Sequence, residues 1–137
     1  MSQETEGSNE PNTTTSTDIL ISITDSSLRW RLIDYLRSQR LNVQGTDTGS
    51  DFLQMYHYSQ PRLVIMSDTL PDWSGLELCQ LIRQQSPTVQ IVFLKTNTIV
   101  LEAFAAGADE VQPMSCDYPV LLARISARLR RAWFDSD

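Results

Sequence analysis

The side chains that most often carry metal or disulfide chemistry are few in this chain of 137 residues. Its two cysteines, Cys79 and Cys116, lie in apolar surroundings and lack the paired spacing of a disulfide framework or a metal site. The single histidine, His57, has no histidine, cysteine or carboxylate partner at the spacing of a zinc ligand set. We therefore expect both cysteines to be small buried residues, and we expect no zinc site.

Polar and charged residues that follow short apolar runs are better candidates for chemistry. These residues are Asp25, Ser67, Asp68 and Lys95. In an open parallel sheet, ligands bind beyond the carboxyl ends of the strands, at the point where the strand order reverses. The chemistry of the chain thus depends on whether the apolar runs are neighbouring parallel strands.

From residue 18 onward, the sequence alternates between short apolar runs and segments of helical periodicity. The predicted strands are residues 19–23, 41–43, 63–66, 91–94 and 109–112. A helical segment follows each strand, and the last one covers residues 118–131. Ser26 or Ser27 is predicted to cap the first helix, and Gly107 to end the fourth. The alternation predicts a five-stranded, doubly wound α/β fold with a parallel sheet covered on both faces.

Four motifs in this frame resemble the receiver domain of two-component response regulators. They are LVIM at 63–66, LPDWSGLEL at 70–78, GADE at 107–110 and LLARI at 121–125. With the order of the elements, they cover about residues 18–131. The resemblance implies a CheY-like, flavodoxin-like (βα)5 fold with strand order 2-1-3-4-5. The last two motifs are similar to the OmpR/PhoB subfamily, whose receivers precede a winged-helix DNA-binding domain.

A receiver of this family carries its phosphorylation chemistry at five positions. An aspartate on the third strand attacks the phosphoryl donor, and two carboxylates at the end of the first strand help to bind Mg²⁺. A threonine or serine on the fourth strand and a lysine after the fifth bind the phosphoryl oxygens. In this sequence the two carboxylates, the aspartate, the hydroxyl and the lysine correspond to Ile23, Thr24, Ser67, Lys95 and Met114.

All five residue types depart from the pattern of the family. Ser67 has no carboxylate with which to form an acyl phosphate. Neither Ile23 nor Thr24 is a charged ligand for Mg²⁺. The resemblance therefore implies a degenerate receiver, or pseudo-receiver. Such a protein is not an enzyme, needs no Mg²⁺ or other cofactor, and acts in signal transduction independently of aspartate phosphorylation.

Two acids close to these positions leave an alternative open. An active phosphorelay receiver could use Asp68 as a displaced phosphoacceptor, although a shift of one residue reverses the direction of a strand side chain. Asp25 could supply one metal ligand after a slip in register, or cap the first helix. Lys95 is expected to fill the space beside Ser67 and to pair with Asp68 or Asp25.

A second expected site is the surface of the fourth helix, the fifth strand and the fifth helix. In the OmpR/PhoB subfamily this surface forms a symmetric homodimer through reciprocal charge pairs. Asp109, Glu110 and Arg124 match its charged positions, and Val100 and Val120 stand where a second charged pair is found. An apolar pair avoids the desolvation of charge, so the valines favour a constitutive dimer. They are equally compatible with ordinary core or surface positions.

Composition narrows the classes of function. The formal net charge is −6, which argues against a nucleic-acid-binding surface. The only basic cluster is Arg124, Arg128, Arg130 and Arg131. No apolar run reaches the length of a membrane span, and the amino terminus lacks the pattern of a signal peptide. We expect a cytoplasmic protein whose partner is a second copy or another signalling protein.

The two ends of the chain differ from its centre. Residues 1–17 contain no hydrophobic residue after the initiator methionine, and they are predicted to be a disordered tail. The receiver-like domain is expected over residues 18–131, with a tail or the start of a linker over 132–137. The chain could accordingly be the N-terminal part of a transcription regulator.

Overall fold

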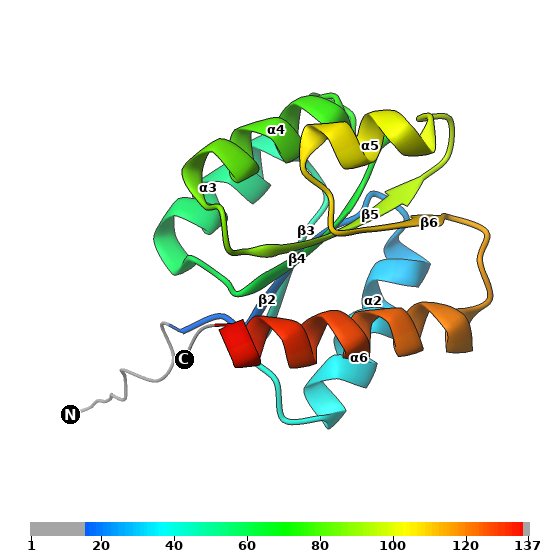
Figure 1. Ribbon diagram of the computed structural model, residues 1–137. Coiled ribbons are helices and arrows are strands. Elements are labelled where there is room, and N and C mark those ends of the chain that lie inside the picture. Colours follow the sequence, from blue (N-terminus) through cyan, green and yellow to red (C-terminus); the bar gives the residue numbers. More distant parts are fainter. Residues whose placement is uncertain (1–15, 136–137) are drawn as a thin grey trace.

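Five parallel strands form one sheet in the computed structural model, which describes residues 16–135 (Figure 1). The strands are β2 (Ile19–Ser22), β3 (Val43–Thr46), β4 (Leu63–Ser67), β5 (Gln90–Lys95) and β6 (Glu110–Pro113). Their order across the sheet is β3-β2-β4-β5-β6. Counted along the chain this is 2-1-3-4-5, so the predicted doubly wound fold is confirmed.

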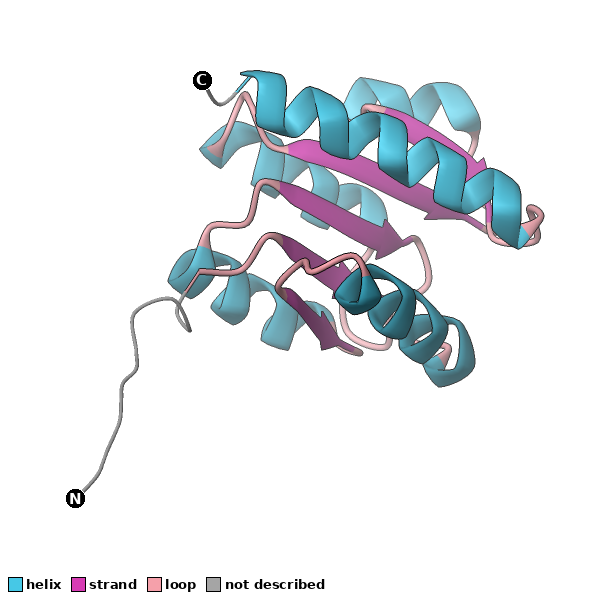
Figure 2. Cartoon of the chain, turned by 90° about the horizontal axis from the view of Figure 1, so that it is seen from below, coloured by secondary structure: helices cyan, strands magenta, loops and turns pink. Residues whose placement is uncertain are grey.

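Helices cover both faces of this sheet. They are α2 (Ser26–Ser38), α3 (Gly49–Ser59), α4 (Gly75–Gln85), α5 (Val100–Ala106) and α6 (Tyr118–Asp135). The helices α3, α4 and α5 lie on one face, and α2 and α6 lie on the other (Figures 1 and 2). The three layers enclose two hydrophobic clusters, one on each side of the sheet.

The central strands are buried on both faces, which explains their unbroken apolar runs. In β2, Ile19 and Ile21 belong to the cluster beneath α2 and α6, whereas Leu20 belongs to the cluster on the opposite face. In β4, Ile65 and Val64 divide between the clusters in the same way. Because all of these side chains are buried, the strand ends are left as the places for polar groups.

The first helix is capped by a different residue from the one predicted. The Asp25 carboxylate accepts a hydrogen bond from the N–H of Leu28 at 3.1 Å, so Asp25 is the N-cap of α2. The prediction of Ser26 or Ser27 as the cap is therefore wrong by one or two positions, because Asp25 supplies the acceptor. Gly107, with a φ of 119°, ends α5 as predicted.

The second strand lies two residues later than the predicted 41–43. The turn after α2 continues through Leu41, whose N–H donates to the carbonyl of Leu36 at 3.3 Å. The strand β3 reads Val-Gln-Gly-Thr, and one apolar residue gives no recognisable run. The helix α2 packs closely over Gly45, since a Cβ there would lie 2.6 Å from Cδ1 of Ile33, and a larger residue would displace that side chain.

The last helix also ends later than predicted. Its end was expected at residue 131, with a tail or linker over 132–137, but α6 continues to Asp135. Ala132 is buried, and the guanidinium of Arg62 lies 4.7 Å from the centre of the Trp133 ring. These contacts extend the packing of α6 beyond the last basic residues, so the helix continues.

The predicted N-terminal tail falls mostly outside the described residues, as do residues 136 and 137. Within the described part, Thr17 is buried, and the carbonyl of Ser16 accepts a hydrogen bond from the side chain of Asn42. These two residues therefore pack against the domain. No helix within residues 16–135 is long and apolar enough to cross a membrane.

Candidate functional site

The carboxyl edge of the sheet carries the five positions that the motifs predict. Ser67 ends β4, and Lys95 ends the neighbouring strand β5. Met114 follows β6, and its N–H donates to the carbonyl of Lys95 at 2.8 Å. Ile23 and Thr24 follow β2, which pairs with the other side of β4. These residues thus lie at the edge where a doubly wound fold binds its ligands.

Two hydroxyl groups at this edge converge on one backbone carbonyl. The Oγ1 of Thr24 donates to the carbonyl oxygen of Thr69 at 3.1 Å, and the Oγ of Ser67 lies 3.4 Å from the same oxygen. Ser67 is fully buried, and the fully buried Ile23 belongs to the core beneath α2 and α6. Where the family has acids, this chain therefore has neutral hydrogen bonds and an apolar side chain.

The loop from β2 to α2 is held by an arginine and not by a metal ligand set. The guanidinium of Arg29 donates to the carbonyls of Ile23 and Thr24, at 2.5 Å and 3.2 Å. The Asp25 carboxylate caps α2, as one of its two interpretations predicted. The register slip that would turn Asp25 into a metal ligand does not occur.

Asp68 is the only carboxylate beside Ser67 in sequence, and it binds the loop that follows β5. Its Oδ2 accepts hydrogen bonds from three successive N–H groups, of Thr96 at 2.8 Å, Asn97 at 3.1 Å and Thr98 at 3.0 Å. Its Oδ1 is shielded from solvent and has no partner among the described residues. One oxygen is engaged by three N–H groups and the other is shielded from solvent, which disfavours Asp68 as a displaced phosphoacceptor.

These contacts also stabilise the charged form of the Asp68 carboxyl. Burial alone would raise the pKa of this group, but the N–H groups of Thr96 and Thr98, the side chain of Thr98 and the N–H of Asn97 together outweigh burial and hold its pKa below the ordinary value. A group whose folded-state pKa is depressed stabilises the fold at pH values above its pKa in the unfolded chain. That stabilisation is lost as the pH falls through the folded-state pKa.

We expect the Asp68→Asn variant to show this linkage. The difference in unfolding free energy between wild type and variant should be largest near pH 6. It should become smaller below about pH 4, where aspartate becomes protonated. Asp72, whose carboxylate accepts the N–H groups of Gly49 and Ser50, also has a lowered pKa. It is present in both proteins, so urea unfolding across this pH range isolates Asp68. A difference independent of pH would contradict the expectation.

Lys95 does not make the predicted ion pairs. It is partly buried at the end of β5. Among the described residues it forms no salt bridge with Asp68 or Asp25. Instead, Asp25 accepts a backbone N–H at the start of α2, and Asp68 accepts backbone N–H groups from the loop that follows β5.

The residues at the edge do not fit Mg²⁺, the ion that the family uses. Mg²⁺ needs several oxygen ligands, and carboxylates are the usual protein contribution. The two acidic positions are Ile23 and Thr24, and the nearby Asp25 and Asp68 are engaged by N–H groups. Within residues 16–135, no three side chains of the His, Cys, Asp or Glu types gather as a metal site.

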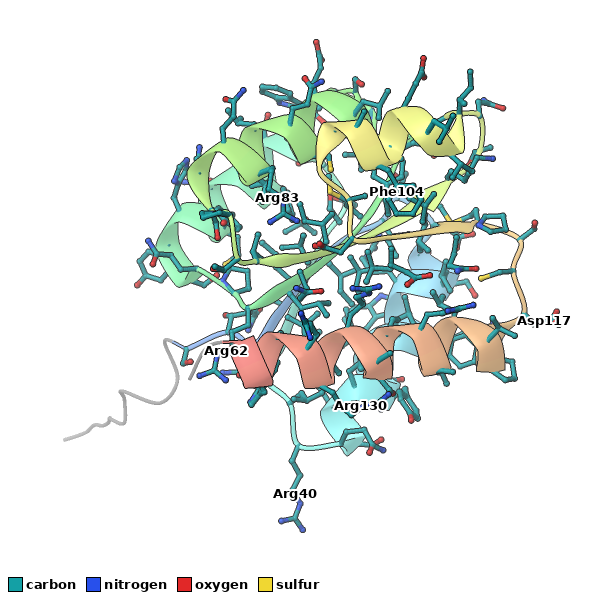
Figure 3. All side chains as sticks on the ribbon, in the orientation of Figure 1. Arg40, Arg62, Arg83, Phe104, Asp117 and Arg130 are labelled. Atoms are coloured by element: carbon teal, nitrogen blue, oxygen red, sulfur yellow. The ribbon has the colours of Figure 1, made fainter. Side chains whose placement is uncertain are left out.

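The acids predicted for the second site already have partners within the chain. Arg83 extends from α4 towards β6 (Figure 3), and its guanidinium pairs with Asp109 at 2.6 Å. The same carboxylate oxygen of Asp109 accepts the N–H of Ile91 at 2.8 Å. Glu110 pairs with Arg128 at 3.4 Å and with Arg124 at 3.7 Å. Within one copy, these ion pairs link α4 and α6 to the sheet. Reciprocal pairs between two copies therefore stay a prediction.

The two valines of the second site are surface residues, with Val100 43% exposed and Val120 44% exposed. Their neighbours on α5 were not predicted to belong to the site. Leu101 is 77% exposed, and Ile99 and Phe104 are also exposed. The Ile-Val-Leu run that begins this Ala-rich helix was the signal for the patch, because so short a helix cannot bury every side. We call Ile99, Val100, Leu101 and Phe104 the α5 apolar face.

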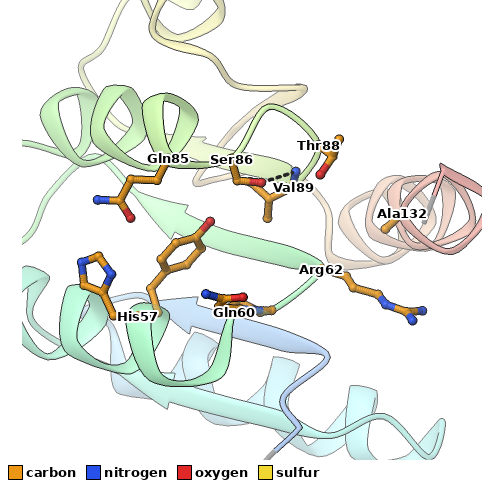
Figure 4. A pocket seen from close by; sticks show the side chains of 10 residues that line it. His57, Gln60, Arg62, Gln85, Ser86, Thr88, Val89 and Ala132 are labelled. Atoms are coloured by element: carbon orange, nitrogen blue, oxygen red, sulfur yellow. Dashed lines mark hydrogen bonds between the residues drawn. The ribbon is translucent and has the colours of Figure 1, made fainter. Parts of the chain in front are cut away.

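The opposite end of the sheet holds a cavity of about 340 Å³ (Figure 4). Its lining is largely polar and includes His57, Gln60, Arg62 and Ser86. The Oγ of Ser86 accepts the N–H of Val89 at 3.1 Å and so belongs to the turn before β5. None of the predicted site residues lines this cavity.

Comparison with protein families and curated proteins agrees with the geometry. Residues 19–126 match the response regulator receiver domain. The DNA-binding response regulator MtrA of Mycolicibacterium smegmatis is 34% identical over 116 residues, which cover 82% of this chain and 50% of MtrA. The transcriptional regulatory protein GltR of Pseudomonas aeruginosa is 32% identical over 121 residues, covering 85% of this chain and 50% of GltR. The chain thus spans about half the length of these relatives.

Solved structures show the same fold. The BeF3-activated receiver domain of DrrB has a TM-score of 0.75 and 28% identity, covering 84% of this chain and 98% of that one. DrrB is an OmpR/PhoB homologue of Thermotoga maritima. A CheY-like receiver domain protein of Methanospirillum hungatei has a TM-score of 0.80 at 20% identity, over 88% of this chain and 98% of its own. That last similarity concerns the fold alone.

Proposed function

The chain belongs to the response regulator receiver domain family of two-component signalling, and from this premise we propose that it is a pseudo-receiver. It signals through protein contacts, without phosphorylation of an aspartate and without Mg²⁺. The observation that carries the proposal is Ser67, which occupies the position of the family's aspartate, is fully buried, and has its hydroxyl 3.4 Å from the carbonyl of Thr69. A serine at this position cannot form an acyl phosphate.

The proposed contact surface consists of α5, β6 and α6. Its α5 apolar face is exposed, and Val120 on α6 adds a further exposed apolar side chain. A patch of this kind is typical of a protein contact site. A second copy of the chain is the proposed partner, since a two-fold axis brings identical patches together. Docking of another signalling protein is the second candidate.

The names of two relatives suggest where such a module would act. MtrA is a DNA-binding response regulator and GltR a transcriptional regulatory protein, each about twice the matched length. We propose that this chain is the regulatory part of a transcription regulator and that its dimer sets the spacing of the regulator's two halves. This step rests on similarity to those proteins and not on a DNA-binding surface in the described residues.

A phosphorylation assay tests the central claim. The chain is incubated with Mg²⁺ and acetyl phosphate, beside an active receiver domain as positive control, and its intact mass is measured. We expect no gain of a phosphate on this chain. A gain of one phosphate that disappears in Asp68→Asn would overturn the proposal and establish Asp68 as a displaced phosphoacceptor.

A further inference from the structure

The backbone of Asp68 is fixed from two sides. Its N–H donates to the carbonyl of Leu94 at 3.1 Å, which continues the pairing of β4 with β5 beyond Ser67. The first residue of α4, Gly75, is pressed against it, because a Cβ on Gly75 would lie 2.5 Å from the Cα of Asp68. The carboxylate therefore leaves a rigid backbone position in a set direction.

The carboxylate points at a set of backbone N–H donors. Three successive N–H groups, of Thr96, Asn97 and Thr98, point at a single carboxylate oxygen at 2.8–3.1 Å. Successive N–H groups arranged in this way form an anion-binding concavity. Here the anion is a side chain of the same protein, one position beyond the residue that replaces the family's aspartate.

The bound loop leads directly into the α5 apolar face. Ile99, the N-cap residue of α5, makes no side-chain cap hydrogen bond. A helix of only seven residues without such a cap has little stability of its own. Ala103 and Ala106 anchor α5 in the core, and Arg83 holds the carbonyl of Gly107 at its C-terminal end. The position of its N-terminal end depends on how residues 96–98 are held, and the Asp68 carboxylate holds them.

We propose that Asp68 is an internal carboxylate ligand that fixes the loop of residues 96–98 and thereby keeps α5 in one position, with its apolar face displayed at all times. The part of this inference that concerns contact with a partner rests on the proposed function. The positioning itself does not, because it concerns contacts within one chain. In this reading Asp68 is a positioning residue and its negative charge is never modified.

The experiment is amide hydrogen exchange on the full chain, comparing wild type with Asp68→Asn and Asp68→Ala. We expect exchange at residues 96–98 and in α5 to rise at least about tenfold, while the amides of β4 keep their protection. Asp25→Ala is the matched control, since it removes one carboxylate cap from α2, and it should raise exchange in α2 alone. A variant in which the loop and α5 keep wild-type protection overturns the inference, as does an equal rise throughout the chain.

Chemical rescue by a small carboxylate adds a second measurement, because it would not restore protection if the Asp68 side chain only filled space. In Asp68→Ala the concavity formed by the three N–H groups is free to bind a small carboxylate. Sodium formate should then restore protection at residues 96–98, and sodium chloride at the same ionic strength should not. Equal effects of the two salts would overturn the inference. Light scattering on the same variants measures dimerisation separately. A monomeric wild type would count against the proposed dimer. The inference about Asp68 would still be decided by the hydrogen-exchange result.

Discussion

Replacing Arg83 by methionine is expected to lower the free energy of unfolding by about 3 kcal/mol, as measured by urea unfolding at neutral pH. Its guanidinium donates five hydrogen bonds to four acceptors, which are the carbonyls of Ser86, Val89 and Gly107 and the carboxylate of Asp109. Methionine retains much of the aliphatic chain but removes every donor. The partly buried carboxylate then loses its cation, and the turn that ends α5 loses its link to α4.

A matched control separates this network from an ordinary arginine contact. Arg37 on α2 donates one hydrogen bond, to the carbonyl of Val43 at 2.9 Å, so Arg37→Met should cost below about 1 kcal/mol. Arg83→Lys should fall between the two, because one ammonium group cannot reach acceptors on three sides. Equal losses for Arg83→Met and Arg37→Met would show that the network adds nothing beyond a single bond.

The fold was predictable because three of its strands, β2, β4 and β5, are buried on both faces. Such strands read as apolar runs, and these three and the edge strand β6 were found within one or two residues of their true bounds. The strand β3 lies at the sheet edge, and only Val43 gives it apolar character. Its pairing with β2 depends on tertiary packing, including the close approach of α2 over Gly45. The local sequence pattern does not predict such packing.

The positions of the candidate site could be counted from motifs, but the roles of its charges could not. Ser67 and Lys95 lie at neighbouring strand ends, as the strand order requires. The role of Asp68 depends on three N–H groups about thirty residues away, which the β4–β5 register brings to its carboxylate. Charge complementarity suggested Lys95 as its partner, but the carboxylate binds backbone donors and forms no salt bridge with Lys95 among the described residues.

The same limit applies to the second site. Asp109 and Glu110 were assigned to pairs between copies on the strength of a motif, yet each has an arginine partner within its own chain. Their partners are separated from them by 26 and 18 residues, so no local rule connects them. With these charges satisfied internally, apolar contact is left as the main driving force for the proposed association through α5, β6 and α6.

That reasoning gives a prediction for the dimer. In Leu101→Glu, a side chain that is 77% exposed in the single chain acquires a charge that a dimer would bury. Burying even an uncharged polar group without a partner costs about 1–3 kcal/mol, and burying a charge costs more. Because a two-fold axis places the substitution in the interface twice, the dissociation constant should rise at least about thirtyfold. Sedimentation equilibrium on wild type and variant measures this change.

Tyr58→Glu is the matched control for charge. Tyr58 is 80% exposed on α3, outside the α5 apolar face, and the substitution adds the same negative charge to the chain. Both variants should keep the wild-type free energy of unfolding at concentrations where the protein is monomeric, since both positions are exposed. A dimer weakened equally by both substitutions would mean that net charge governs association. A dimer weakened only by Leu101→Glu assigns the contact to α5, because the two proteins then differ only in where the charge lies.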